Sequence, residues 1–196
     1  MITRYLAVLA AACVSTLGAQ ARVIPLPDTL GADFSIADSA RRNGTPGDYD
    51  AVLGVWHFTF QWRQNDGTFG TPFTGHWSFR KRPGTRVVIE DQWRRDDATQ
   101  PFESGILTYR AYNPHRKLWE VQGTSTNDDT PWLPGVGWSD AANRYLVQHY
   151  PDRTIIRFRY LAIEPNRFLW RADMSRDGGL TWTRDWWTMV VTRVGR

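Results

Sequence analysis

Cysteine is almost absent from this chain, which has 196 residues and only Cys13. That residue lies in an uncharged, mostly apolar run from Tyr5 to Gly18, which is too short to span a bilayer. Ala19-Gln20-Ala21 then offers a small-x-small cleavage site, so we expect residues 1–21 to be a signal peptide that is removed near Ala21. The exported chain, periplasmic or secreted, would have no thiol. This excludes disulfides, a cysteine nucleophile and a thiolate metal site.

Lysine and glutamate are also scarce. Lys81 and Lys117 are the only lysines, so arginine supplies nearly all of the positive charge behind the formal net charge of +4. Arginine forks suit carboxylates, phosphates and aromatic faces, which favours an anionic partner, but a GC-rich genome produces the same bias. The few scattered glutamates do not suggest the pair of facing carboxylates that a glycosidase requires.

No long helical pattern occurs from Ala51 onward. Short alternating runs follow one another instead, separated at hairpin spacing by turn signals such as Asn65-Asp66-Gly67. About nine or ten such runs predict an all-β fold: a single up-and-down antiparallel barrel over residues 50–196, with a β-sandwich as the alternative. Residues 22–49 are rich in proline and glycine, and we expect an irregular N-terminal arm with one short helix near Phe34 to Arg42.

The first run of the expected barrel places large aromatic side chains on one face. By alternation Phe58, Phe60 and Trp62 share the face of Trp56. If Trp56 points inward, the barrel has a heavily aromatic lumen. Eleven tryptophans in the chain fit either a wide core or a surface for stacking.

Two further runs place polar groups beside aromatic ones. Asp91 shares a face with Trp93, and Arg110 shares a face with Tyr112. We expect both faces to point inward, where an isolated charge is costly, so the carboxylate and the guanidinium should pair or meet a polar ligand. A single bulge would invert either face.

The strand pattern breaks between Asn127 and Asp140, where we expect a longer loop. This loop carries Trp132 and Trp138. Over an open barrel mouth such aromatic side chains would grip a ligand, whereas the alternative is that they pack back on the core.

Several motifs together resemble a known family. Gly54-Val55-Trp56 opens the first run, Tyr109 to Pro114 reads YRAYNP, and Phe168 to Trp170 precede the sequence SRDGGLTW. This combination is similar to a bacterial, often exported domain-of-unknown-function family with a calycin (lipocalin-like) β-barrel, over roughly Asp50 to Arg193. The resemblance implies that Trp56 plugs one end of the barrel and that Arg193 packs over it. The family implies no established reaction and therefore no catalytic residues.

The sequence SRDGGLTW, from Ser175 to Trp182, matches the Asp-box turn of sialidases. A propeller needs several blades, and one such turn in a chain of this length excludes that fold. We therefore interpret Asp177, Gly178 and Gly179 as a hairpin turn, with Trp182 entering the next strand.

The function that these patterns favour is binding of a small aromatic or amphipathic molecule, possibly anionic through Arg110 or Arg171, inside the barrel. One alternative is a cyclase, isomerase or hydrolase in the same pocket, with Asp91, Tyr112 or Tyr160 moving protons. The other is a structural or interaction module with a filled core. The candidate ligand-binding residues are Phe58, Phe60, Trp62, Trp77, Asp91, Trp93, Arg110, Tyr112, Trp132, Trp138, Tyr160 and Trp170.

Other function classes have weaker support in the sequence. The four histidines show no ligand spacing, although His57 and His76 should lie on neighbouring strands of the outer face. No Gly-x-Ser-x-Gly elbow is present. We expect no cofactor, no metal, no nucleic-acid partner and no membrane insertion, and the sequence leaves the oligomeric state open.

Overall fold

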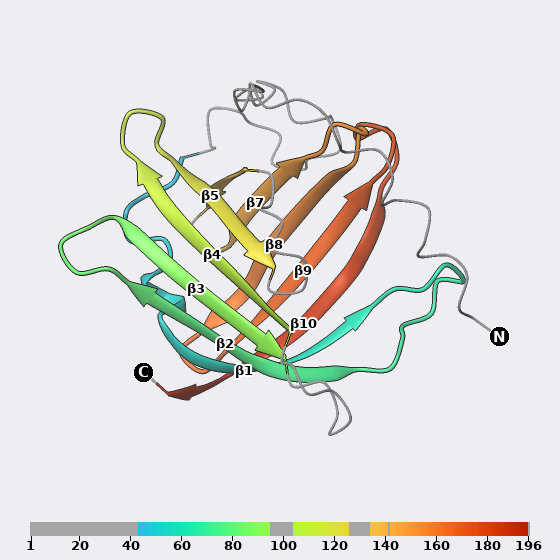
Figure 1. Cartoon of the computed structure of the whole chain (residues 1–196), viewed down its shortest axis with the longest axis horizontal. Coiled ribbons are helices and arrows are strands. Elements are labelled where there is room, and N and C mark those ends of the chain that lie inside the picture. Colours follow the sequence, from blue (N-terminus) through green and yellow to red (C-terminus); the bar gives the residue numbers. More distant parts are fainter. Residues whose placement is uncertain (1–42, 95–103, 126–133, 141, 196) are drawn as a thin grey trace, which may run out of the picture.

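Ten antiparallel strands run through the part of the chain that the structure, a computed structural model, describes: residues 43–94, 104–125, 134–140 and 142–195 (Figure 1). Each strand pairs with the next one along the chain, and β10 pairs with β1, so the sheet closes into an up-and-down barrel. The predicted all-β barrel of about nine or ten strands is confirmed. The strands are β1 (Gly54–Trp62), β2 (Phe73–Lys81), β3 (Val87–Arg94), β4 (Ser104–Asn113), β5 (Leu118–Ser125), β6 (Gly135–Ser139), β7 (Arg144–His149), β8 (Ile155–Glu164), β9 (Arg167–Ser175) and β10 (Thr183–Gly195).

Residues 1–42 lie outside the described part of the chain. The expected signal peptide, the helix near Phe34 to Arg42 and most of the arm therefore stay predictions. No helix among the described residues has the length and apolar character needed to cross a membrane.

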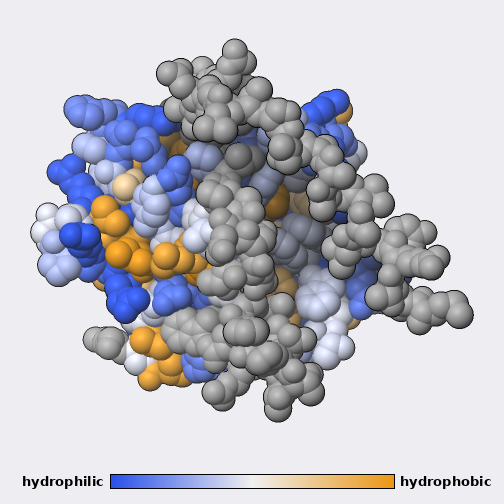
Figure 2. Space-filling view, in the orientation of Figure 1, coloured by the Kyte–Doolittle hydropathy of each residue, from blue (hydrophilic) through white to orange (hydrophobic). Residues whose placement is uncertain are grey.

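Strand β1 shows why this sequence forms a barrel wall. Trp56 and Phe58 are buried in the interior, whereas His57 lies on the outer face, where its ring meets that of His76 on β2 at 5.6 Å between centroids. The two histidines are directly opposite in the β1–β2 register, as the alternation predicts. Most of the visible outer face is hydrophilic, and hydrophobic side chains gather on the side where β3 and β4 run (Figure 2).

One end of the barrel is closed. A short 3-10 helix, Asp50–Val52, precedes β1, and the indole nitrogen of Trp56 donates a hydrogen bond to the Val52 carbonyl at 2.7 Å. The Arg193 guanidinium lies over the Trp56 ring, 3.9 Å from its centroid, and donates to the carbonyls of Ala51 and Leu53. Trp56 is fully buried by these contacts. The turn between β8 and β9 lies at the same end, since Arg193 also donates to the Pro165 carbonyl.

The hairpin between β9 and β10 has the hydrogen bonds of a self-contained turn. Asp177 accepts from the Ser175 hydroxyl at 2.8 Å and from the Thr181 amide at 2.9 Å. Gly178 and Gly179 have φ of 78° and 94°, which a side chain would strain. Trp182 lies just before β10, where Arg157 stacks on its ring, so it joins the outer surface of the wall and not the strand itself.

The expected loop from Asn127 to Asp140 is wrong in its second half, since residues 135–139 form β6. Gly135 and Gly137 alternate in this strand, so it has little apolar periodicity to reveal it. A Cβ atom at Gly137 would lie 2.9 Å from the Tyr145 carbonyl oxygen of the neighbouring strand β7, which explains why glycine is required there. Trp132 lies outside the described residues.

Candidate functional site

A cavity of about 470 Å³ occupies the lumen above the closed end. Its size falls within the range of roughly 300–1,000 Å³ that is usual for small-molecule sites. The core of this barrel is therefore not filled, which argues against a structural module with a fully packed interior.

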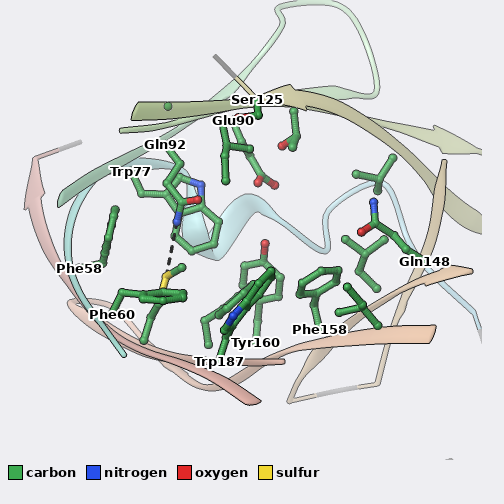
Figure 3. A pocket seen from close by; sticks show the side chains of 18 of the residues that line it. Phe58, Phe60, Trp77, Glu90, Gln92, Ser125, Gln148, Phe158, Tyr160 and Trp187 are labelled. Atoms are coloured by element: carbon green, nitrogen blue, oxygen red, sulfur yellow. Dashed lines mark hydrogen bonds between the residues drawn. The ribbon is translucent and has the colours of Figure 1, made fainter. Parts of the chain in front are cut away.

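The cavity has two chemically different sides (Figure 3). Phe60, Trp187 and Phe158 lie along one side, whereas Glu90, Gln92 and Ser125 lie along the opposite side. On the aromatic side, the rings of Trp170 and Trp187 are inclined by only 14° with centroids 6.4 Å apart. Strands β1, β8, β9 and β10 supply this aromatic wall, and β3, β4 and β5 supply the polar wall.

A buried ionic network forms the floor of the cavity. Arg110 on β4 is 2% exposed, and its Nε donates to the Glu90 carboxylate on β3, which is also buried. Its two terminal nitrogens donate to the Tyr49 hydroxyl at 3.0 Å and to the Tyr160 hydroxyl at 2.6 Å. The guanidinium also lies over the Tyr49 ring, 4.7 Å from the centroid. The network neutralises the Arg110 charge and fixes its direction.

Among the titratable side chains of this floor, Tyr160 has a clearly shifted pKa. Burial raises the pKa of Tyr160 far above the usual value for a phenol, and the nearby Arg110 charge only partly opposes that shift. The hydroxyl therefore stays protonated at neutral pH. Figure 3 shows this hydroxyl pointing into the cavity.

Seven of the candidate residues come together around the cavity. Phe58, Phe60 and Trp62 line it from β1, with Trp62 at the more exposed end of the strand. Arg110 points inward as predicted. Of the two expected ways to satisfy its charge, a carboxylate or a polar ligand, the structure shows a carboxylate, which is Glu90 and not the expected Asp91. The other three predicted residues that line the cavity are Trp77, Tyr160 and Trp170.

The predicted inward direction of Asp91 is wrong. Its side chain is 44% exposed on the outer face, 3.9 Å from the Arg80 guanidinium. Strand β3 has apolar residues on both faces, and the face with more of them, which contains Ile89, points outward. Glu90 is buried instead, because Arg110 on the neighbouring strand compensates its charge. The side chain of Trp93 lies outside what the structure describes.

Three other candidates lie away from the cavity. Tyr112 shares the inner face with Arg110 but sits nearer the closed end, where its hydroxyl donates to the Gly44 carbonyl at 3.0 Å. Trp138 stacks on Tyr145 in a separate cluster, with 5.7 Å between ring centroids. Arg171 donates to main-chain carbonyls of β9 and β10, so it is not an anchor inside the lumen.

Sequence reasoning identified seven of the 23 lining residues and missed the other sixteen. The polar residues of β3 were overlooked because the opposite face of that strand was expected inside. Thr108 on β4 shares the inner face that was correctly predicted for Arg110, but it was not singled out. Phe158 lies between two arginines of β8, so this part of the strand has no run of apolar residues. Trp187 follows Trp186 directly, and a bulge at Asp185, where φ is 48°, changes which residues of β10 point inward. The missed lining residues include Glu90, Gln92, Thr108, Gln148, Phe158 and Trp187.

A second charged cluster lies on the outer wall beneath the β9–β10 turn. Asp173 is fully buried there, and Arg157, Arg159 and Arg184 surround its carboxylate. The Asp185 amide also donates to it. Hydrogen bonds and these positive charges hold the pKa of Asp173 below its usual value despite burial. The cluster ties β8 and β9 to the bulge of β10.

Metal ligation has no support among the residues that the structure describes, where no group of three or more His, Cys, Asp or Glu side chains is arranged to hold an ion. Neither cavity wall offers such a group.

Comparisons with known proteins leave the family open. No family model matches the chain, and no curated protein matches it. The chain is similar to a solved structure of EF1p2_mFAP2b bound to DFHBI, at 17% identity, over 76% of this chain and 98% of that one, with a TM-score of 0.33. It is also similar to a redesigned beta barrel, mFAP1, bound to DFHBI, at 16% identity, over 74% and 96%, with a TM-score of 0.30. At these TM-scores the likeness adds nothing to the fold that the strand pairing defines.

Proposed function

We propose that this protein is an exported binding protein that takes a flat aromatic or amphipathic small molecule into its lumen. The observation that carries the proposal is the cavity of about 470 Å³ with one aromatic and one polar side. Export is supported by the apolar run and the small-x-small site at the N-terminus. Membership of the lipocalin-like family is supported by the Gly54-Val55-Trp56 opening and by the contact between Arg193 and Trp56.

The aromatic wall favours a planar ligand. Phe158, Trp170 and Trp187 form a series of nearly parallel rings, with Phe158 and Trp170 5.3 Å apart between centroids and inclined by 28°. A flat ring system that slides against this wall gains contact area along its whole face, and offset stacking adds to the gain. An aliphatic chain would leave part of that surface uncovered.

Blocking the lumen tests this function. The probe is 6-propionyl-2-dimethylaminonaphthalene, a neutral dye whose emission shifts to shorter wavelength in apolar surroundings. Ile106 lines the cavity, whereas the next residue, Leu107, points outward with 47% exposure. Ile106→Trp should weaken dye binding at least tenfold by filling the cavity, and Leu107→Trp, the matched control, should bind like the unchanged protein.

Both variants should first be shown to keep the far-ultraviolet circular dichroism of the barrel. Equal dye affinity for the unchanged protein and for Ile106→Trp would place the dye outside the lumen and overturn the proposal. Absence of dye binding to the unchanged protein would count against it in the same way.

Catalysis in the same cavity is a second candidate, favoured by the Tyr160 hydroxyl that Arg110 holds at the cavity floor. Of the three proton-transfer candidates, Asp91 and Tyr112 lie elsewhere. The raised pKa of Tyr160 suits donation of a hydrogen bond better than transfer of a proton at neutral pH, so binding stands first. Native mass spectrometry of protein purified from its own cells separates the two, since a binding protein should carry one unmodified small molecule at a fixed ratio.

A further inference from the structure

Two polar groups of the cavity wall have no hydrogen-bond partner in the part of the chain that the structure describes. The indole nitrogen of Trp77 and the hydroxyl of Thr108 are buried, and neither makes a hydrogen bond within the described part of the chain. Trp77 is 3% exposed and Thr108 is 6% exposed, and both line the cavity. A buried polar group without a partner costs roughly 1–3 kcal/mol. A ligand that supplies the missing partners would recover that cost on binding.

Tyr160 adds a third donor at the same depth. Its hydroxyl oxygen already accepts from Arg110, so its own proton is directed elsewhere, and Figure 3 shows the hydroxyl facing the cavity. The Tyr160 ring lies next to that of Trp77, with 5.8 Å between centroids. The two side chains therefore line the same part of the cavity.

The charges of the cavity floor cancel. Glu90 and Arg110 are the charged side chains among the described residues that line the cavity, and they form a salt bridge with each other. Arg110 also donates to Tyr49 and Tyr160, so three of its nitrogens are engaged. A ligand carboxylate would have to compete with Glu90 for the guanidinium and would lie beside that negative charge. The floor therefore disfavours an anion.

From these contacts we propose that the cavity selects an uncharged aromatic molecule with a hydrogen-bond-accepting oxygen, such as a ketone, at its inner end. Trp77 and Tyr160 donate to that oxygen, Thr108 contributes a further hydrogen bond, and the flat body of the molecule lies on the aromatic wall. This inference rests on the proposed binding function and specifies the ligand class. It replaces the anionic ligand that the sequence suggested.

Three naphthalenes of similar size test the inference by isothermal titration calorimetry at pH 7. 2-Acetylnaphthalene is neutral and carries an acceptor, 2-naphthoate carries an acceptor and a negative charge, and 2-ethylnaphthalene carries neither. We expect the ketone to bind about tenfold more tightly than each of the others, because only the ketone satisfies the free donors without charge repulsion.

Two variants connect this preference to the named groups. Trp77→Phe removes the indole donor and keeps an aromatic ring, and Thr108→Val removes the hydroxyl at nearly constant shape. Each should lower the ratio of ketone affinity to 2-ethylnaphthalene affinity severalfold to tenfold, because only the ketone loses a hydrogen bond. Thr74→Val, on the exposed outer face of β2, is the matched control and should change neither affinity.

The outcomes distinguish this inference from the proposed function. If the three compounds bind equally, or if 2-naphthoate binds most tightly, the lumen binds ligands but the inference is overturned. The inference is also overturned if neither variant changes the preference for the ketone. If Trp77→Phe does not fold, the result for Thr108→Val alone decides whether the inference stands. If none of the three compounds binds the unchanged protein, the proposed function itself fails.

Discussion

Arg110 keeps a full positive charge at a position where only 2% of the residue is exposed. It tolerates burial because Glu90 and two tyrosine hydroxyls receive its hydrogen bonds. Alternation along YRAY was enough to predict that Arg110 points inward and that a carboxylate or a polar ligand should meet it. It was not enough to identify the carboxylate, because Glu90 and Asp91 are neighbours on opposite faces of β3.

Removing the charge of Glu90 should destabilise the barrel strongly. Glu90→Gln leaves a buried, unpaired guanidinium, and we expect the free energy of unfolding to fall by about 3 to 5 kcal/mol. Urea titration followed by circular dichroism measures the change.

The neighbouring carboxylate provides the control for that experiment. Asp91→Asn alters a solvated side chain and should shift the free energy of unfolding by no more than about 0.5 kcal/mol. The double variant Glu90→Leu with Arg110→Met should recover much of the lost stability, because no buried charge remains. A larger loss in the free energy of unfolding for Asp91→Asn than for Glu90→Gln would contradict the assignment of the Glu90 face of β3 to the lumen.

At the scale of one element, the β9–β10 turn is specified by its local sequence. Ser175, Asp177 and Thr181 bond to one another and to the turn amides, and these contacts need no other strand. This is why the turn was predictable from the motif alone. Strand β6 is the opposite case, because its alternate glycines are explained only by the close approach of the neighbouring strands, including the Tyr145 carbonyl of β7 near Gly137.

Asp177 should make the stability of this turn depend on pH. Hydrogen bonds from the Thr181 side chain and amide, and from Ser175, hold the pKa of Asp177 well below its usual value. Because the folded pKa is the lower one, the stabilisation is present above the unfolded value of about 3.9 and is lost as the pH falls toward the folded value. Asp177→Asn should therefore lower the melting temperature at pH 7, and the difference from the unchanged protein should shrink below about pH 4.

Differential scanning calorimetry across that pH range measures the effect. The turn does not line the cavity, so dye affinity should not change. A variant that melts normally but no longer binds the dye would assign the turn a functional role.

At the scale of the whole molecule, closure depends on β1 meeting β10. This pairing joins the first and last strands and lets Arg193 reach the 3-10 helix, the Trp56 ring and the β8–β9 turn at once. Two segments that are distant in sequence, residues 51–56 and the β8–β9 turn, are therefore held by one side chain of β10. The Gly-x-Trp resemblance implied the contact with Trp56, whereas the carbonyl partners became visible only in the structure.

Arg193→Met should open this closed end. The substitution removes the hydrogen bonds from the guanidinium to three carbonyls, and it also removes the cation–π contact with Trp56. We therefore expect the free energy of unfolding to fall by about 2 kcal/mol. Arg193→Lys should restore less than half of that loss, since an ammonium group cannot reproduce the planar fork. Arg167→Met, an exposed residue of β9, should change the free energy by less than about 0.5 kcal/mol. Guanidinium titration gives all three values, and full rescue by lysine would contradict the geometric role of the fork.

The sequence by itself determined the all-β barrel, the order of most strands, the aromatic face of β1 and the β9–β10 turn. These features follow from alternation and turn chemistry, which act over a few neighbouring residues. Only the tertiary structure decided that Glu90 and not Asp91 enters the lumen and that Trp138 packs on the outer wall. It also decided that Trp77 and Thr108 line the cavity with polar atoms that have no hydrogen-bond partner among the described residues. When the two faces of a strand are similar, the local sequence does not decide which face points inward. The neighbouring strands decide it, because they offer a guanidinium to pair with, a ring to stack on, or an open space.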